Sequence, residues 1–129
     1  MDYPAAVERH FWRPANVGPL VSGAARLPRG EAGSAAAGVW VVIEADIGAG
    51  AVRALAFRAL GCPYVIAACS LATQKLTGKP AATLGSFDVT SLAGELQAPA
   101  EKLGSLLILQ DALRNCFGDW DTTQPAGAR

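Results

Sequence analysis

The stretch VWVVIEAD at residues 39–46 decides the fold class, because it is the strongest strand signal in the chain. Its β-branched and aromatic side chains suit a pleated, half-buried surface. A glycine turn at 48–50 follows it, and residues 52–60 then alternate apolar side chains with Arg53 and Arg58, although imperfectly. A helix over 52–60 is the alternative, but the turn favours a strand that pairs back on 39–46 as a hairpin.

Helical patterns lie on both sides of this predicted hairpin. In the first of them, Val7 and Phe11 are four residues apart and share an apolar stripe with Tyr3. Pro63 suits the first position of a second helix, where the missing N–H has no partner to lose. We expect helices at residues 2–11, 63–76, 89–96 and 100–117, one further strand near 20–25, and a flexible tail over 120–129.

The order of these elements predicts a single domain over residues 1–129 of the α+β class. Strands come first and most helices follow, which favours helices packed on one face of a small sheet. A length of 129 residues fits one ordinary domain, and 51% hydrophobic residues are enough for a real core.

Composition and motifs exclude several functions. Eleven Lys and Arg balance eleven Asp and Glu, which disfavours a nucleic-acid binder. No apolar run approaches the roughly 18 residues of a membrane span, and the start of the chain lacks the pattern of a signal peptide. The three cysteines have no disulfide-framework spacing, so a reducing cytoplasm is the expected compartment. The chain lacks a phosphate loop, a Cys-x-x-Cys pair and a nucleophile elbow, so we expect no enzyme activity.

Several weak features occur along the chain in an informative order. HFWRPANVG stands at 10–18, RALGC at 58–62 leads into IAACS at 66–70, and a Gly-Lys pair follows at 78–79. Near the other end, Pro99 and Lys102 precede Asp111 and Ala112. This succession resembles the IscU/NifU N-terminal family of iron–sulfur cluster assembly scaffolds over residues 3–116, most firmly at 10–18 and 61–79.

The resemblance implies a fold, a cargo and partners. The fold is a three-stranded antiparallel sheet with packed helices, of the SufE/NifU-like kind. The cargo is a nascent cluster built from iron and from sulfur that a cysteine desulfurase delivers, and acceptor proteins receive it. The family's site has a Cys-Gly-Asp before a strand, a Gly-Cys at a helix start and a His-Cys at the start of the last helix. Thiolates suit this cargo because they are soft ligands.

Carried over position by position, the resemblance implies a degenerate metal site. The Cys-Gly-Asp position reads Ala37-Gly38-Val39, and the His-Cys position reads Gly104-Ser105. Cys62 is therefore the one family ligand that is kept. A single thiolate cannot hold a cluster that takes four ligands. We expect an iron–sulfur cluster, iron or zinc only with ligands from a partner or a second subunit.

Other chemistry-bearing residues have plainer interpretations. Cys69 is expected to be buried packing, and Cys116 to be packing or a partly exposed thiol. We expect His10 to make a hydrogen bond near the first helix rather than to bind metal. Lys102 is a candidate partner contact, although a solvated lysine is the more ordinary reading. Trp12 and Trp40 are expected to pack, and Trp120 to be exposed.

Three functions stay open. The first is a scaffold-like protein of iron–sulfur cluster assembly that is unable to hold a cluster alone. The second is an interaction or regulatory module of that pathway that binds no cluster, with the desulfurase, acceptor proteins or a homo-oligomer as partner. The third is a persulfide or thiol carrier that uses Cys62, activated by the helix start alone.

Overall fold

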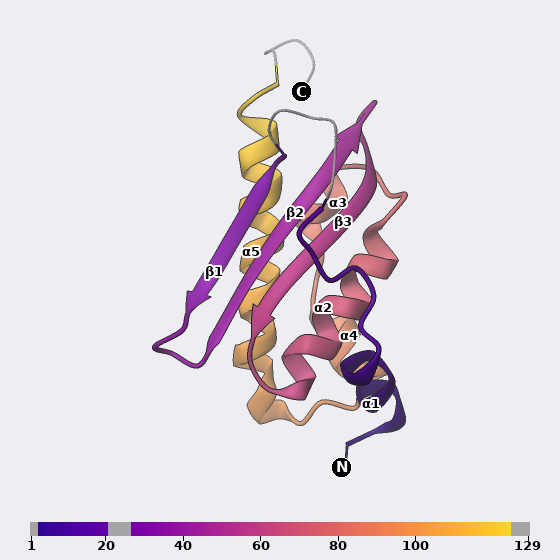
Figure 1. The fold of residues 1–129 in the computed structure, drawn as a ribbon, viewed down its shortest axis with the longest axis vertical. Coiled ribbons are helices and arrows are strands. Elements are labelled where there is room, and N and C mark those ends of the chain that lie inside the picture. Colours follow the sequence, from indigo (N-terminus) through magenta and orange to yellow (C-terminus); the bar gives the residue numbers. More distant parts are fainter. Residues whose placement is uncertain (1–2, 21–26, 125–129) are drawn as a thin grey trace.

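The sheet predicted from the sequence is present. The computed structural model describes residues 3–20 and 27–124, and within these the sheet has three strands in the order β1-β2-β3 (Figure 1). Both strand pairs are antiparallel, and Ile43 lies opposite Phe57 across the central pair. The predicted hairpin is therefore confirmed. The strands are β1 (Arg29–Ser34), β2 (Val39–Gly48) and β3 (Ala51–Leu60).

Helices cover one face of this sheet, as the element order predicts. Two long helices, α2 (Pro63–Leu76) and α5 (Leu103–Asp121), run behind the strands in Figure 1. The core lies between these layers, and its larger side chains are fully buried. The remaining helices are α1 (Ala5–Trp12), α3 (Ala82–Ser86), α4 (Thr90–Glu95) and the short 3₁₀ helix η1 (Ala100–Lys102).

No local pattern predicted the first strand of the described residues. We expected a strand near residues 20–25, of which 21–25 lie outside the described part of the chain, and the structure has β1 at Arg29–Ser34. Its sequence, RGEAGS, holds no β-branched or aromatic residue, so propensity gives no signal. Contacts with the rest of the fold stabilise this segment as a strand. A Cβ on Gly30 would lie 2.0 Å from the Ala112 carbonyl oxygen, so a glycine is needed for β1 to approach α5 this closely.

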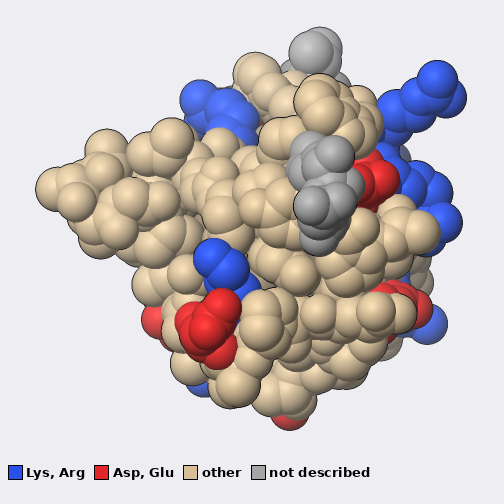
Figure 2. All heavy atoms as spheres, turned by 90° about the horizontal axis from the view of Figure 1, so that it is seen from below, with Lys and Arg blue, Asp and Glu red and all other residues tan. Residues whose placement is uncertain are grey.

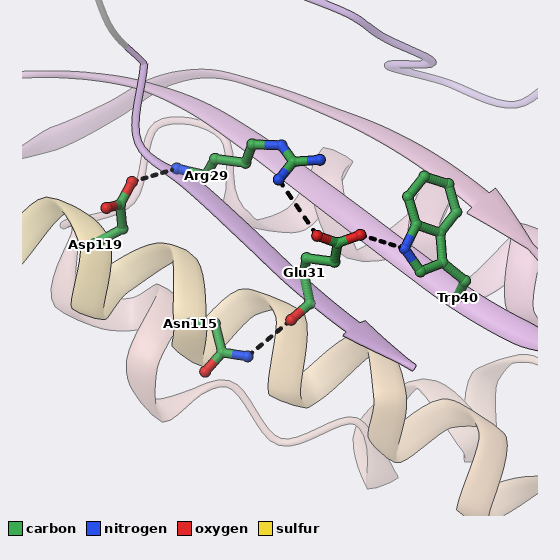
Figure 3. A network of polar contacts seen from close by, with 5 residues as sticks. All are labelled: Arg29, Glu31, Trp40, Asn115 and Asp119. Carbon is green, nitrogen blue, oxygen red and sulfur yellow. Dashed lines mark hydrogen bonds and ion pairs between the residues drawn. The ribbon is translucent and has the colours of Figure 1, made fainter. Parts of the chain in front are cut away.

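Polar contacts fasten the same strand (Figure 3). Asn115 of α5 donates to the backbone carbonyl of Glu31 at 2.9 Å, and the Arg29 N–H donates to Asp119 at 2.9 Å. The Trp40 indole N–H donates to the Glu31 carboxylate from the neighbouring strand. The two contacts with α5 join residues 84 and 90 positions apart in the sequence, so local patterns could not reveal them.

The last helix is longer than expected at its end. It was predicted to end near Phe117, but α5 continues through Asp121, and η1 occupies 100–102. Trp120, expected to be exposed in a tail, is half-buried with its ring centroid 5.9 Å from that of Phe117. The unexpected α3 packs here too, because a Cβ on Gly85 would lie 2.8 Å from the Phe117 ring. No helix in residues 3–20 and 27–124 has the length and apolar character needed to cross a bilayer.

The segment after α1 covers the open edge of β3. The Phe57 N–H donates to the Asn16 carbonyl, and the Gly18 N–H donates to the Phe57 carbonyl, both at 2.8 Å. A Cβ on Gly18 would lie 2.8 Å from that of Ala56, so the glycine permits this close crossing. The ANVG part of the sequence thus pairs the N-terminal segment with the sheet and protects its edge.

Candidate functional site

Three segments that the sequence singled out lie at one end of the molecule. The β1–β2 turn, the β3–α2 junction and the start of α5 all lie at the lower end of Figure 1. Seen from below, this end is dominated by uncharged residues, and the β1–β2 turn projects from it (Figure 2). The fold therefore gathers the three segments on one largely neutral surface.

The first segment is the turn before β2. Ala37 is exposed, and its N–H donates to the Ser34 hydroxyl at 3.1 Å. Gly38 has a φ of +79°, a left-handed conformation that favours glycine. Val39 then starts β2 opposite Ser34, with its side chain half-buried against the core. Neither Ala37 nor Val39 presents a donor to a metal.

Cys62 begins the second segment. It is the N-cap residue of α2, directly before Pro63, and its carbonyl accepts the first helical hydrogen bond from Val65 at 2.9 Å. The thiol is free and half-buried. Because Trp40 pairs with Leu60, two residues before Cys62, the β3–α2 junction lies at the same end of the sheet as the start of β2.

The third segment is the first turn of α5. Gly104 is exposed, and a Cβ added there would meet no described atom within 4 Å, so the space for a larger side chain is open. Ser105 and Lys102 are half-buried. One turn further on, the Ile108 side chain lies 3.0 Å from where a Cβ on Gly33 would stand, which places this part of α5 against the β1–β2 hairpin.

The donors at this end do not form a metal site. Residues 3–20 and 27–124 contain no cluster of three or more His, Cys, Asp or Glu side chains that could hold a metal ion. Cys69, three residues beyond Ile66 within α2, is completely buried, and burial raises the pKa of its thiol far above the ordinary value. Burial, with help from Asp119 and Glu44, raises the pKa of Cys116 to about 12. Both buried thiols therefore stay protonated and poor as ligands.

His10 lies in a separate structural network, as expected. Its Nδ1 is 2.8 Å from the Ser70 hydroxyl, which also accepts the Ala15 N–H at 2.8 Å. The Asn16 amide donates to Thr73 at 3.1 Å one turn along α2. Burial and the neighbouring Arg9 lower the pKa of His10, so the neutral imidazole is favoured. These bonds dock the N-terminal segment on α2.

The comparisons with known proteins decide the family. The model of the NifU-like N terminal domain matches residues 2–126, which is nearly the whole chain. The chain belongs to the NifU-like N-terminal domain family. The iron–sulfur cluster assembly scaffold protein IscU of Haemophilus influenzae is 27% identical over 125 residues, covering 96% of this chain and 99% of the relative. The mitochondrial iron sulfur cluster assembly protein 1 of Eremothecium gossypii is 29% identical over 126 residues, covering 96% and 82%.

Solved structures share the fold of this NifU-like chain. The N-terminal part of a NifU-like protein from Brucella abortus matches with a TM-score of 0.70 at 16% identity, covering 94% of this chain and 95% of the other. A SUF-system scaffold protein from Fervidobacterium islandicum, described as putative, matches with a TM-score of 0.65 at 14% identity, covering 89% and 96%. The α+β architecture is thus the family's.

The exposure of one aromatic side chain was missed in the sequence. Trp12 was expected to pack, but its side chain is 67% exposed, so that expectation was wrong. The signal was available, because at 100° per residue Trp12 falls outside the stripe of Tyr3, Val7 and Phe11. Trp40 does pack, half-buried, with its N–H bonded to Glu31.

Proposed function

We propose that this NifU-like protein acts in iron–sulfur cluster assembly but cannot complete a cluster site with its own side chains. The observation that carries the proposal is the donor set of the three gathered segments. Cys62 supplies one thiol, and the other positions of these segments, Ala37, Val39, Gly104 and Ser105, offer one hard hydroxyl and no second soft donor. A cluster held here therefore takes its remaining ligands from a partner or a second copy of the chain.

The named roles of the relatives support the pathway. The Haemophilus influenzae and Escherichia coli relatives are both named iron–sulfur cluster assembly scaffold proteins, and the latter is 26% identical over 127 residues. The role is one of binding rather than catalysis, with a cysteine desulfurase and acceptor proteins as partners. The three free thiols fit a reducing compartment such as the cytoplasm.

An anaerobic loading experiment tests this proposal. The chain is incubated with ferric iron and sodium sulfide, which supplies the sulfur already as sulfide and brings no thiol, with or without glutathione as an external thiolate. Iron and acid-labile sulfide per chain are measured after desalting. We expect little uptake without glutathione and clear uptake with it. The Cys62→Ala variant loses that uptake, whereas Ser105→Ala, changed in the same surface, retains it.

Two results would reject parts of the proposal. A full cluster on the isolated chain without added thiol would reject the incomplete site. No uptake under any condition would reject cluster handling and leave the second function.

The second candidate is a docking module that holds no cluster. Its supporting observation is that Leu60 and Leu107 are 47% and 39% exposed on elements that carry the second and third segments. Exposed apolar side chains on a neutral surface are typical of protein contacts. In this function the chain binds a cysteine desulfurase through this end, and Cys62→Ala leaves the binding unchanged.

Charge substitution tests the docking surface. The double variant Leu60→Glu/Leu107→Glu is expected to weaken desulfurase binding at least tenfold in calorimetry. The control Gln74→Glu/Thr90→Glu adds the same charge at exposed positions of α2 and α4 and is expected to bind normally. Equal loss in both variants would reject the surface. Unaltered binding in the first variant would reject it as well.

A further inference from the structure

The outer face of α1 is an unusual surface. Ala5, Glu8, Arg9, Trp12 and Arg13 line a shallow groove of about 430 Å³. Trp12 is the most exposed large apolar side chain of the described residues, and its indole ring meets the Phe11 ring edge-on at 5.1 Å. A tryptophan held in this way presents a broad apolar surface at low entropic cost to a partner.

The helix that carries this groove is held firmly. Val7 is fully buried in the core, and the Tyr3 ring packs on that of Tyr64 at 5.2 Å. The hydrogen bond between His10 and Ser70 fixes the same helix to α2. The position of Trp12 is therefore set by contacts on the opposite face of α1, and a partner meets a preorganised surface.

The charges on this face are free of ion pairs within the described residues. Arg9 lies in the last turn of α1 and Arg13 is its C-cap, and both are exposed. In residues 3–20 and 27–124 neither guanidinium makes an ion pair, and Glu8 is the one acidic residue of the groove. Figure 2 shows Lys and Arg side chains along the side where Figure 1 places α1. Beyond their favourable position at the C-terminal end of α1, both guanidinium groups are open to carboxylates of a partner.

We propose that this face of α1 binds an acidic segment of another protein. Its carboxylates pair with the guanidinium groups of Arg9 and Arg13, and one of its apolar side chains packs on Trp12. Planar guanidinium groups match carboxylates in a bidentate geometry. Two cations are too few for an anionic membrane or a nucleic acid, which need larger basic clusters, and the chain has no net charge. This binding does not depend on cluster assembly.

A peptide selection tests the proposal. A library of random 16-residue peptides is selected against the intact chain, and the affinities of enriched peptides are measured by fluorescence anisotropy. We expect enrichment of peptides that combine Asp or Glu with an aromatic or aliphatic residue, with affinity that falls as salt rises. Arg9→Glu/Arg13→Glu and Trp12→Ala should each weaken binding at least tenfold, and amide NMR spectra should show both variants folded.

A charge-matched control separates the surface from net charge. Arg53→Glu/Arg58→Glu makes the same change in charge at exposed positions of β3 and should leave the affinity within twofold of wild type. The proposal is overturned if no acidic peptides are enriched, or if they bind the α1 variants as tightly as wild type. Binding to phosphatidylserine vesicles that depends on Arg9 and Arg13, or self-association that Trp12→Ala abolishes, would also overturn it by assigning the face to another occupant.

Discussion

At the residue scale, one buried histidine ties the N-terminal segment to α2. The Ser70 hydroxyl accepts the Ala15 N–H, which leaves its own proton to donate to Nδ1 of a neutral His10. A second proton on the ring would place a charge in a site that is 7% exposed and beside Arg9, and Glu95 on α4 offsets this in part. The neutral form of His10 therefore favours the docking of the N-terminal segment on α2.

This network predicts a pH dependence of stability. The pKa of His10 is about 6.5 in the unfolded chain and lower in the folded chain. Above the unfolded value both states are neutral, and stability does not vary through this group. As the pH falls below it, the unfolded chain takes up the proton first, so the free energy of unfolding decreases by up to about 1.4 kcal/mol per pH unit until the folded pKa is reached.

Denaturant unfolding at a series of pH values checks this prediction. The wild-type chain should lose stability relative to His10→Gln as the pH falls, because carboxylate effects cancel in the comparison. The chain has one histidine, so its imidazole NMR signals also report the folded pKa without ambiguity. A folded pKa above the ordinary value would contradict this explanation.

Thiol reactivity is predicted to differ among the three cysteines. Cys69 and Cys116 are fully buried with raised pKa values, whereas Cys62 is half-buried at a helix start. Iodoacetamide at neutral pH should therefore modify one thiol in the native chain and three in denaturant. Mass spectrometry gives the count, and native Cys62→Ala should remain unmodified. Fast modification of either buried thiol would refute the assigned burial.

At the element scale, the strands and helices that could be predicted from the sequence are those with a local sequence pattern. β2 has β-branched side chains, and α2 has a proline at its first position and a glycine shortly after its end. β1 has no such signal, because its formation depends on a glycine approaching α5 and on hydrogen bonds across more than 80 residues. The exposure of Trp12 could have been predicted from helical periodicity, but Trp12 was expected to pack.

Two glycine substitutions test the account of β1. In Gly30→Ala the new Cβ would lie 2.0 Å from the Ala112 carbonyl oxygen and 2.2 Å from the Cys116 nitrogen, both backbone atoms. Strand and helix must separate, which should lower the free energy of unfolding by about 3 kcal/mol or more. Gly104→Ala, in open space within α5, should raise it by up to about 1 kcal/mol. Equal effects of the two substitutions on unfolding would show that the close approach is not needed.

At the scale of the whole molecule, the fold is the family's, and we propose that the donor set of its site is incomplete. The three segments that the resemblance implies for the site lie at one end of the molecule, through the sheet register and the packing of α5. The sequence cannot say what completes the site, because ligands from outside the chain leave no trace in it. In this proposal the backbone frame of the site is kept while its metal-binding side chains are missing.

Restoring the donors tests this claim most directly. Iron and acid-labile sulfide per chain are measured after anaerobic loading, without external thiols, for wild type and for Ala37→Cys/Val39→Asp/Gly104→His/Ser105→Cys. The control Ala37→Ser/Val39→Asp/Gly104→His keeps Ser105 and adds no thiol. We expect a stable cluster on the fourfold variant and none on wild type or the control. A wild-type chain that loads as fully as the fourfold variant would contradict it.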